Sequence, residues 1–450
     1  MSKATMRFPL AVVIGLMFSI MVPAHAQLVK IDAALGTPVM LAGERATTFL
    51  RVALTGEDIK DESKRAPLNV SIVIDKSGSM QGEKMEAAKR AAKAAVERLR
   101  KDDIVSIIAY DTTVSIVQPA IQIGDVKTTQ PILAAIDLVN AGGSTALFAG
   151  VSMGAGELRK DLGSGRVNRL VLLSDGLANI GPSSPGELAE LGISLGREGI
   201  NVTTLGLGLD YNEDLMSRLA SSSDGNHMFI DSVNDLERAY AMEFGDAMTV
   251  VARDASVIIR CEDGVRPVRS LGRDAIINGQ AARIDIGQIG SQRTKYCLLE
   301  VELPAGADGG SAEVASVDVS YVEMKSQEKA NRNQSVKVRY SSSKDEVKRS
   351  TNTAVMVAAV QQIAADRNVL AMRLRDSGKI EEARQELLSN RAYLYENFSR
   401  YDDEQLKRDA DTNGFAAENL DPEQWKYNRK LQQEYQVGIK KQGVILEKGR

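Results

Sequence analysis

Histidine and aromatic residues are scarce in this sequence, and both shortages exclude functions. The 450 residues contain two histidines, His25 and His227, and aromatic residues make up 4% of the chain. So few aromatic side chains argue against a surface that stacks nucleic-acid bases or sugar rings. Lys and Arg total 56 against 60 Asp and Glu, so no basic excess favours nucleic-acid binding. We therefore expect no nucleic-acid partner.

The first 26 residues have the composition of a secretion signal. Lys3 and Arg7 precede a short apolar run, and residues 24–26 read Ala-His-Ala. This pattern is typical of a signal peptide cleaved after Ala26, and the run is too short for a stable membrane span. Because no other long apolar run follows, we expect an exported protein, periplasmic or secreted, with no stable span in the mature chain. Cleavage leaves His227 as the single histidine, which excludes a multi-histidine zinc site.

Cysteine is scarce as well, with only Cys261 and Cys297. Both fall in a part of the chain where the pattern predicts strands. In an oxidising compartment such a pair favours a disulfide bond, which we expect here. The alternative is two buried free thiols in neighbouring strands.

What the sequence does contain is a long alternation of short apolar runs and amphipathic stretches. Four runs read as buried parallel strands: 70–74, 104–109, 170–173 and 202–207. The alternation predicts a doubly wound, mostly parallel α/β sheet, followed by an antiparallel β-sandwich and a C-terminal helical region. The expected order is a signal peptide (1–26), N-terminal strands that join the sandwich (27–66), the α/β domain (67–247), the β-sandwich (248–343) and the helical region with its charged tail (344–450).

Oxygen-bearing side chains follow the buried strands of the α/β domain at three places. Residues 75–79 read Asp-Lys-Ser-Gly-Ser, Thr145 ends a Gly-Gly-Ser-Thr segment, and Asp175 precedes a glycine after the third run. Because the carboxyl ends of parallel strands meet at one sheet edge, we expect these side chains to converge. Hard oxygen donors suit Mg²⁺, or Ca²⁺ and Mn²⁺ less selectively. The sequence therefore predicts a divalent-cation site at Asp75, Ser77, Ser79, Thr145 and Asp175.

These three segments, in this order, resemble the metal-ion-dependent adhesion site of the von Willebrand factor type A domain, over about residues 67–245. The resemblance implies that Ser77 and Ser79 ligate the cation directly. It implies that Thr145 does so in the ligand-competent state, and that Asp75 and Asp175 act mainly through water. The flanking segments also resemble secreted bacterial calcium-activated chloride-channel-like proteins and inter-alpha-trypsin-inhibitor heavy chains. That likeness implies one sandwich interrupted by the metal domain.

The expected function follows from the charge of these ligands. Neutral hydroxyls as direct ligands leave the cation incompletely neutralised and with an open position. The Asp or Glu of a protein partner can complete the shell and bring the missing charge. We therefore expect an adhesion or scaffold protein that captures an acidic residue of a partner, and not an enzyme. The alternative is a structural envelope protein whose metal only stabilises the loop.

A second cation loop is indicated near the C-terminus. Asp409, Asp411 and Asn413 are followed by Gly414, which matches the first half of an EF-hand calcium loop. The twelfth position of such a loop is Glu, but here it is Leu420. Two interpretations stay open at this stage, a calcium loop or a polar loop that ends a helix and is closed by Gly414.

Overall fold

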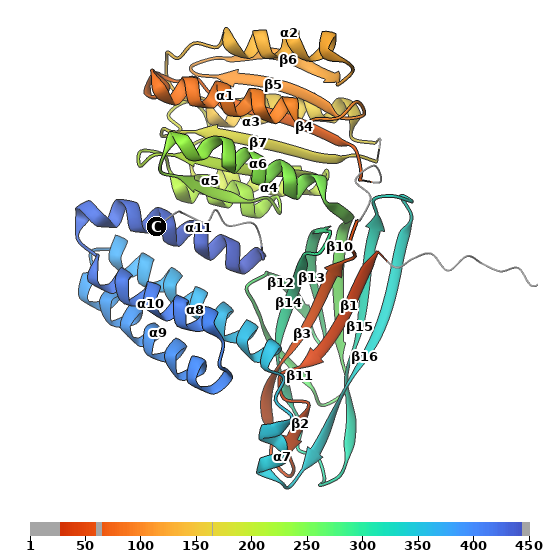
Figure 1. The fold of residues 1–450 in the computed structure, drawn as a ribbon. Coiled ribbons are helices and arrows are strands. Elements are labelled where there is room, and N and C mark those ends of the chain that lie inside the picture. Colours follow the sequence, from red (N-terminus) through yellow and green to blue (C-terminus); the bar gives the residue numbers. More distant parts are fainter. Residues whose placement is uncertain (1–27, 60–64, 164, 443–450) are drawn as a thin grey trace, which may run out of the picture.

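The computed structural model describes residues 28–59, 65–163 and 165–442, and the expected signal peptide lies outside them. The described residues form an α/β domain, a β-sandwich and a helical region (Figure 1). In that view the α/β domain lies above the other two. No helix within these ranges is both long enough and apolar enough to cross a membrane.

A six-stranded sheet forms the centre of the α/β domain. Its strands are β4 (Leu68–Asp75), β5 (Ile104–Tyr110), β6 (Val114–Gln122), β7 (Val167–Ser174), β8 (Ile200–Leu207) and β9 (His227–Ile230). The spatial order is β6-β5-β4-β7-β8-β9, and every neighbouring pair is parallel except β5 and β6. The helices are α1 (Glu83–Glu97), α2 (Val126–Asp137), α3 (Leu147–Leu158), α4 (Pro185–Arg197), α5 (Glu213–Ser222) and α6 (Leu236–Met248). The predicted doubly wound, mostly parallel sheet is confirmed.

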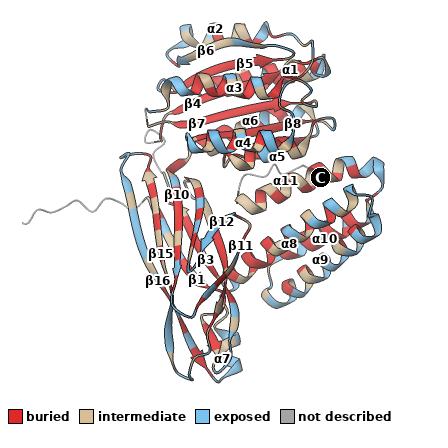
Figure 2. Ribbon diagram, turned by 180° about the vertical axis from the view of Figure 1, so that it is seen from behind, coloured by how far each residue is buried: buried red, intermediate tan, exposed pale blue. Residues whose placement is uncertain are grey.

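The two faces of this sheet bury separate cores, because alternate side chains of a strand point to opposite faces. On β4, Ile72 and Ile74 pack with α1, α2 and α6, whereas Val73 packs with α3, α4 and α5. Figure 2 shows β4, β5, β7 and β8 as buried ribbons among the helices, whereas the edge strand β6 is exposed or half-buried. Burial on both faces explains the continuous apolar runs, and each such side chain contributes about 1.5–3 kcal/mol.

Two sheets make up the sandwich. Its strands are β1 (Val29–Leu35), β2 (Val39–Leu41), β3 (Ala46–Gly56), β10 (Val250–Cys261), β11 (Arg266–Leu271), β12 (Ala275–Asn278), β13 (Ala281–Gly290), β14 (Thr294–Leu303), β15 (Ser311–Glu323) and β16 (Lys329–Ser341). One sheet has the order β1-β3-β14-β11 and the other β12-β13-β10-β15-β16-β2. Strands from both sides of the α/β domain therefore pair within the sandwich, and the α/β domain interrupts it in sequence.

The expected disulfide between Cys261 and Cys297 is wrong for this structure, because both cysteines are free and buried. Cys261 ends β10 in the six-stranded sheet, and Cys297 lies on β14 in the four-stranded sheet. Facing sheets lie about 10 Å apart, whereas a disulfide joins Cα atoms about 4.4–6.8 Å apart. The two cysteines are free thiols, but they do not lie on neighbouring strands. Both side chains belong to the one apolar core between the two sheets.

Five helices form the C-terminal region: α7 (Lys344–Arg349), α8 (Thr353–Asp376), α9 (Ile380–Tyr401), α10 (Glu404–Glu418) and α11 (Pro422–Lys441). Helices α8, α9 and α10 pack against one another in chain order. Helix α11 then returns to the α/β domain, where it contacts α5 and β9 (Figure 1). This return places C-terminal residues beside an edge of the α/β sheet.

The predicted calcium loop is absent, because Asp409, Asp411 and Asn413 lie inside α10. Successive helical residues are rotated by about 100°, so the side chains of Asp409 and Asp411 diverge by about 200° and cannot share a cation. Asp409 accepts hydrogen bonds from Gln405 and Tyr435, and Asp411 accepts one from the Tyr395 hydroxyl. The alternative of a loop closed by Gly414 is also wrong, since the helix continues to Glu418.

Candidate metal centre

The register of β4 with β7 brings the first and third predicted segments to one edge of the sheet. These strands are parallel neighbours with Ile74 opposite Leu173. Asp75 is the last residue of β4, and Asp175 follows the last residue of β7. Both carboxylates are fully buried at this edge.

Two backbone hydrogen bonds bring the second segment to the same edge. Gly78 N donates to Gly143 O at 3.0 Å, and Gly142 N donates to Lys76 O at 2.7 Å. Gly143 has a φ of +77°, and a Cβ there would stand 2.8 Å from Thr112 Oγ1. A side chain at position 143 would thus be both strained and crowded, which explains the glycine in this loop.

Asp75 is held by neutral donors. Its Oδ1 accepts from Ser77 N at 2.8 Å, and its Oδ2 accepts from Ser174 Oγ at 2.7 Å and from Tyr110 OH at 3.3 Å. Burial raises the pKa of Asp75 above its usual value, although the hydrogen bonds from Ser77 and Ser174 oppose that shift. The nearby charge of Asp175 raises the pKa further. The pair therefore favours an added positive charge.

Asp175 is held by one serine and one lysine. Its Oδ1 accepts from Ser79 Oγ at 2.6 Å, and its Oδ2 pairs with Lys84 Nζ at 2.5 Å. Sequence reasoning missed Lys84. It stands in the first turn of α1, where the helix dipole disfavours a cation, and in the folded protein Asp175 offsets that cost.

The hydroxyl groups surround an open space above Gly176. Ser77 Oγ and Ser79 Oγ lie 3.1 Å apart. A Cβ on Gly176 would stand 3.3 Å from Ser79 Oγ and 3.6 Å from Thr145 Oγ1. The three hydroxyl residues and Asp175 line one cavity, with Asp75 bonded behind Ser77, and this donor set fits a hard divalent cation. In the described ranges no cluster of three or more His, Cys, Asp or Glu side chains could hold a metal ion, so any site here depends on the hydroxyls.

Asn179 forms hydrogen bonds with both the amide and the carbonyl group of Thr145. Thr145 N donates to Asn179 Oδ1 at 2.8 Å, and Asn179 N donates to Thr145 O at 3.1 Å. Thr145 is buried, so these bonds fix its position at the rim of the space. Asn179 was not predicted, because it lies on a turn after β7 with no chemical motif of its own.

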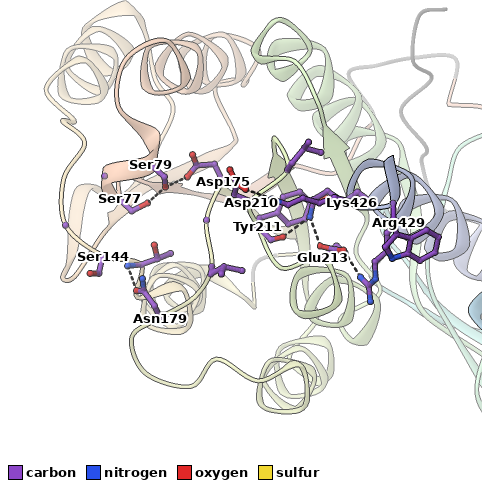
Figure 3. A pocket seen from close by; sticks show the side chains of 18 of the residues that line it. Ser77, Ser79, Ser144, Asp175, Asn179, Asp210, Tyr211, Glu213, Lys426 and Arg429 are labelled. Carbon is purple, nitrogen blue, oxygen red and sulfur yellow. Dashed lines mark hydrogen bonds and ion pairs between the residues drawn. The ribbon is translucent and has the colours of Figure 1, made fainter. Parts of the chain in front are cut away.

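A cavity of about 790 Å³ opens beside this cluster. One side of it comes from the loops at residues 77–79, 143–145 and 175–179, and another from the loop between β8 and α5. The remaining side comes from α11, as Figure 3 shows with Lys426 and Arg429. Helix α11 as a wall of this cavity was not foreseen from the sequence.

Residues 69–240 match the von Willebrand factor type A domain family. Over 263 residues the chain is 29% identical to the uncharacterized protein YfbK of Escherichia coli (strain K12). The aligned part is 57% of this chain and 45% of YfbK. The chain is also 28% identical over 179 residues to inter-alpha-trypsin inhibitor heavy chain H3 of Pongo abelii. The aligned part is 38% of this chain and 20% of that protein. The chain thus spans less than half the length of both curated relatives.

Among solved structures, a von Willebrand factor type A protein from Catenulispora acidiphila aligns with a TM-score of 0.67. The alignment covers 82% of this chain and 86% of that one, at 17% sequence identity. At this identity the likeness concerns the fold alone. It includes parts outside the α/β domain, because the matched share is larger than that domain.

Proposed function

Because the chain contains a von Willebrand factor type A domain, we propose that this domain binds a divalent cation and, through it, an acidic residue of a protein partner. Ser77, Ser79 and Thr145 hold the ion directly, and Asp75 and Asp175 act mainly through water. Mg²⁺ is the expected ion, with Ca²⁺ and Mn²⁺ as less selective alternatives. The bound ion supplies the positive charge that attracts the carboxylate of the partner.

An uncompensated buried charge is the observation that carries this proposal. Among the described residues, Asp75 accepts hydrogen bonds from neutral groups, and Lys84 is the cation paired with Asp175. Of these two fully buried carboxylates, Asp175 is thus paired with an ammonium group, and Asp75 is held by neutral donors. A buried charge without a partner is costly, so the centre favours a further cation.

The neutral hydroxyls account for binding rather than catalysis. Because Ser77, Ser79 and Thr145 bring no charge, the ion keeps most of its positive charge for the partner. Asp75 accepts a hydrogen bond from the backbone amide of Ser77, and Asp175 accepts one from the hydroxyl of Ser79, so the carboxylates position the two serines. We also propose that the protein is exported, because residues 1–26 have the composition of a signal peptide. An adhesion or scaffold role at the cell envelope follows from these parts together.

Calorimetric titration with MgCl₂ tests the proposal. Ser79→Ala removes one hydroxyl from an exposed position, so the variant should fold, and we expect at least about tenfold weaker Mg²⁺ binding, or ~1.4 kcal/mol. Ser144→Ala is the matched control, since it removes a hydroxyl from the neighbouring loop outside the ligand set. Equal Mg²⁺ affinity in the wild type and Ser79→Ala would contradict the proposal.

The structural alternative predicts a different pair of results. The metal would then raise the melting temperature, but acidic peptides would bind equally well with and without EDTA. Binding of such peptides that disappears with EDTA favours metal-dependent capture instead.

A further inference from the structure

The cavity beside the metal loops is a groove with two walls. One wall carries the proposed cation site, and the other comes from α11 and includes Trp425. Lys426 and Arg429 belong to the same wall (Figure 3). The groove's volume of about 790 Å³ lies in the range of sites that enclose small ligands. A groove with two walls suits a protruding or extended segment of a partner.

The α11 wall is firmly held against the α/β domain. Lys430 is almost fully buried, and its Nζ donates to Tyr211 O at 2.8 Å and pairs with Glu213 at 2.5 Å. Arg429 pairs with Glu213 at 2.6 Å and with Asp214 at 2.7 Å. These contacts keep the second wall in place, and they leave Arg429 and Lys430 occupied.

Lys426 differs from these two cations. Its side chain is 54% exposed, and it extends from α11 to pair with Asp210 at 2.6 Å (Figure 3). A lysine ammonium has three donors, and this bond uses one of them. The Asp210 side chain is 72% exposed, and ion pairs that are so exposed contribute little to stability. An incoming carboxylate can therefore bind Lys426 at small cost.

Two apolar side chains line the same groove in contact with water. Leu177 follows the Asp175 turn and is 59% exposed, and Leu209 follows β8 and is 37% exposed. Covering them with an apolar ligand group removes this surface from water, which is favourable. The groove therefore combines a cation site, an apolar patch and a lysine.

We propose that this groove binds an extended peptide segment with two acidic residues. One carboxylate completes the cation shell, an apolar side chain covers Leu177 and Leu209, and the second carboxylate binds Lys426. The first of these contacts rests on the proposed function, whereas the second anchor and the spacing of the two acids go beyond it.

Synthetic peptides test the second anchor. Fluorescein-labelled peptides carry two Asp residues separated by two, three or four positions with Leu between them, and matched peptides have Asn in place of the second Asp. With Mg²⁺ present, fluorescence anisotropy should show that the wild type binds the best two-acid peptide at least about fivefold more tightly than its one-acid match. Lys426→Gln should abolish this preference.

A second variant separates ligand binding from a structural role of the ion pair. Asp210→Asn removes the group that competes for Lys426, so it should strengthen binding of the two-acid peptide. If the Asp210–Lys426 pair only held α11 in place, both substitutions would weaken binding alike. Lys93→Gln is the control, because Lys93 forms a similar ion pair with Asp137 on the surface away from the groove, and it should bind like the wild type.

The outcomes distinguish this inference from the proposed function. Equal, Mg²⁺-dependent binding of the two peptides to the wild type overturns the second anchor and leaves the proposed function intact. Weaker binding of the two-acid peptide in Asp210→Asn also overturns the second anchor. Failure of both peptides to bind in Mg²⁺ overturns the proposed function together with this inference.

Discussion

Lys84 is the residue that competes most directly with a cation at the proposed centre. Its ammonium stands 2.5 Å from Asp175 Oδ2, and Asp175 is fully buried. A divalent ion entering beside Asp175 meets the repulsion of this ammonium, which is substantial at short range in a partly buried site. Lys84 therefore balances the charge of Asp175, and we expect it to weaken the binding of the proposed cation.

Lys84→Met should bind Mg²⁺ more tightly than the wild type, by about tenfold or ~1.4 kcal/mol. The substitution removes the competing charge and retains most of the apolar stem of the side chain. Calorimetric titration with MgCl₂ measures the change, with Lys93→Met as a lysine control distant from the site. Weaker or unchanged Mg²⁺ binding in Lys84→Met would show that Lys84 positions Asp175 rather than competing with the ion.

The two cysteines give a second prediction for single residues. Burial raises the pKa of Cys261 to about 11 and that of Cys297 to about 12. Because the thiolate is the reactive form, neither thiol should react with DTNB in the native protein at pH 8. Both should react after unfolding in guanidinium chloride, even without a reducing agent. An unfolded protein with no reactive thiol would instead indicate a disulfide.

Among the helices, α11 connects the helical region with the α/β domain. It packs on α8 on one side and on α5 and β9 on the other, and it forms a wall of the cavity. Lys430 carries much of this docking, since its Nζ lies over the Tyr211 ring at 3.9 Å as well as on Glu213. Without Lys430, Glu213 would keep Arg429 as its cation partner and the Tyr211 carbonyl would lose its donor, so the cost should lie below the ~3–5 kcal/mol of a buried charge left with no partner. The docked position of α11 therefore depends on Lys430 together with Arg429.

Lys430→Met should increase the rate of hydrogen exchange in α11, over residues 422–441, more than in α8 or α9. Exchange measured by mass spectrometry reports this local opening. Lys426→Gln, which removes a more exposed cation from the same helix, should change the exchange of α11 much less. Equal protection of α11 in the wild type and Lys430→Met would mean that apolar contacts hold the helix.

The sequence predicted those elements whose burial is one-sided or complete. β4 and β7 are buried along their whole length, so their apolar runs were clear signals. β6 was missed because most of its residues are exposed or half-buried on the edge of the sheet. α10 was missed because its residues 409–414 are polar or small and were read as a loop. Its buried positions include Asp409 and Asn413, whose partners lie on α9 and α11.

The candidate site was also predicted only in part. The segments with Asp75, Thr145 and Asp175 were found because each directly follows a strand or precedes a helix. Lys426 was not connected with them, because α11 is more than two hundred residues away in sequence. Only the packing of the helical region against the α/β domain brings that lysine to the cavity.

At the scale of the whole molecule, Asp224 joins the three parts of the chain. It lies between α5 and β9, and it pairs with Lys295 of the sandwich at 2.9 Å and with Arg273 at 3.5 Å. Burial alone would raise the pKa of Asp224, but the charges of Lys295, Arg273 and Lys441 lower it to about 2. Lys441 ends α11, so all three parts contribute to this cluster.

Asp224→Asn should lower the free energy of unfolding by about 3–5 kcal/mol at pH 7, because it leaves buried cations unpaired. The folded pKa of about 2 lies below the usual value of 3.8 for an Asp side chain. The contribution of Asp224 is therefore complete above pH 4 and is lost as the pH falls toward 2. Urea denaturation at pH 7 and near pH 2 measures this. The exposed Asp254→Asn is the control, and a pH-independent deficit in Asp224→Asn would contradict the assignment.

The most direct test of the central claim is a crystal structure of the protein with Mn²⁺, with anomalous scattering recorded to locate the ion. We predict one strong anomalous peak in the space above Gly176, bounded by Ser77, Ser79 and Thr145. A well-ordered crystal with Mn²⁺ in excess and no peak at this place would contradict the account.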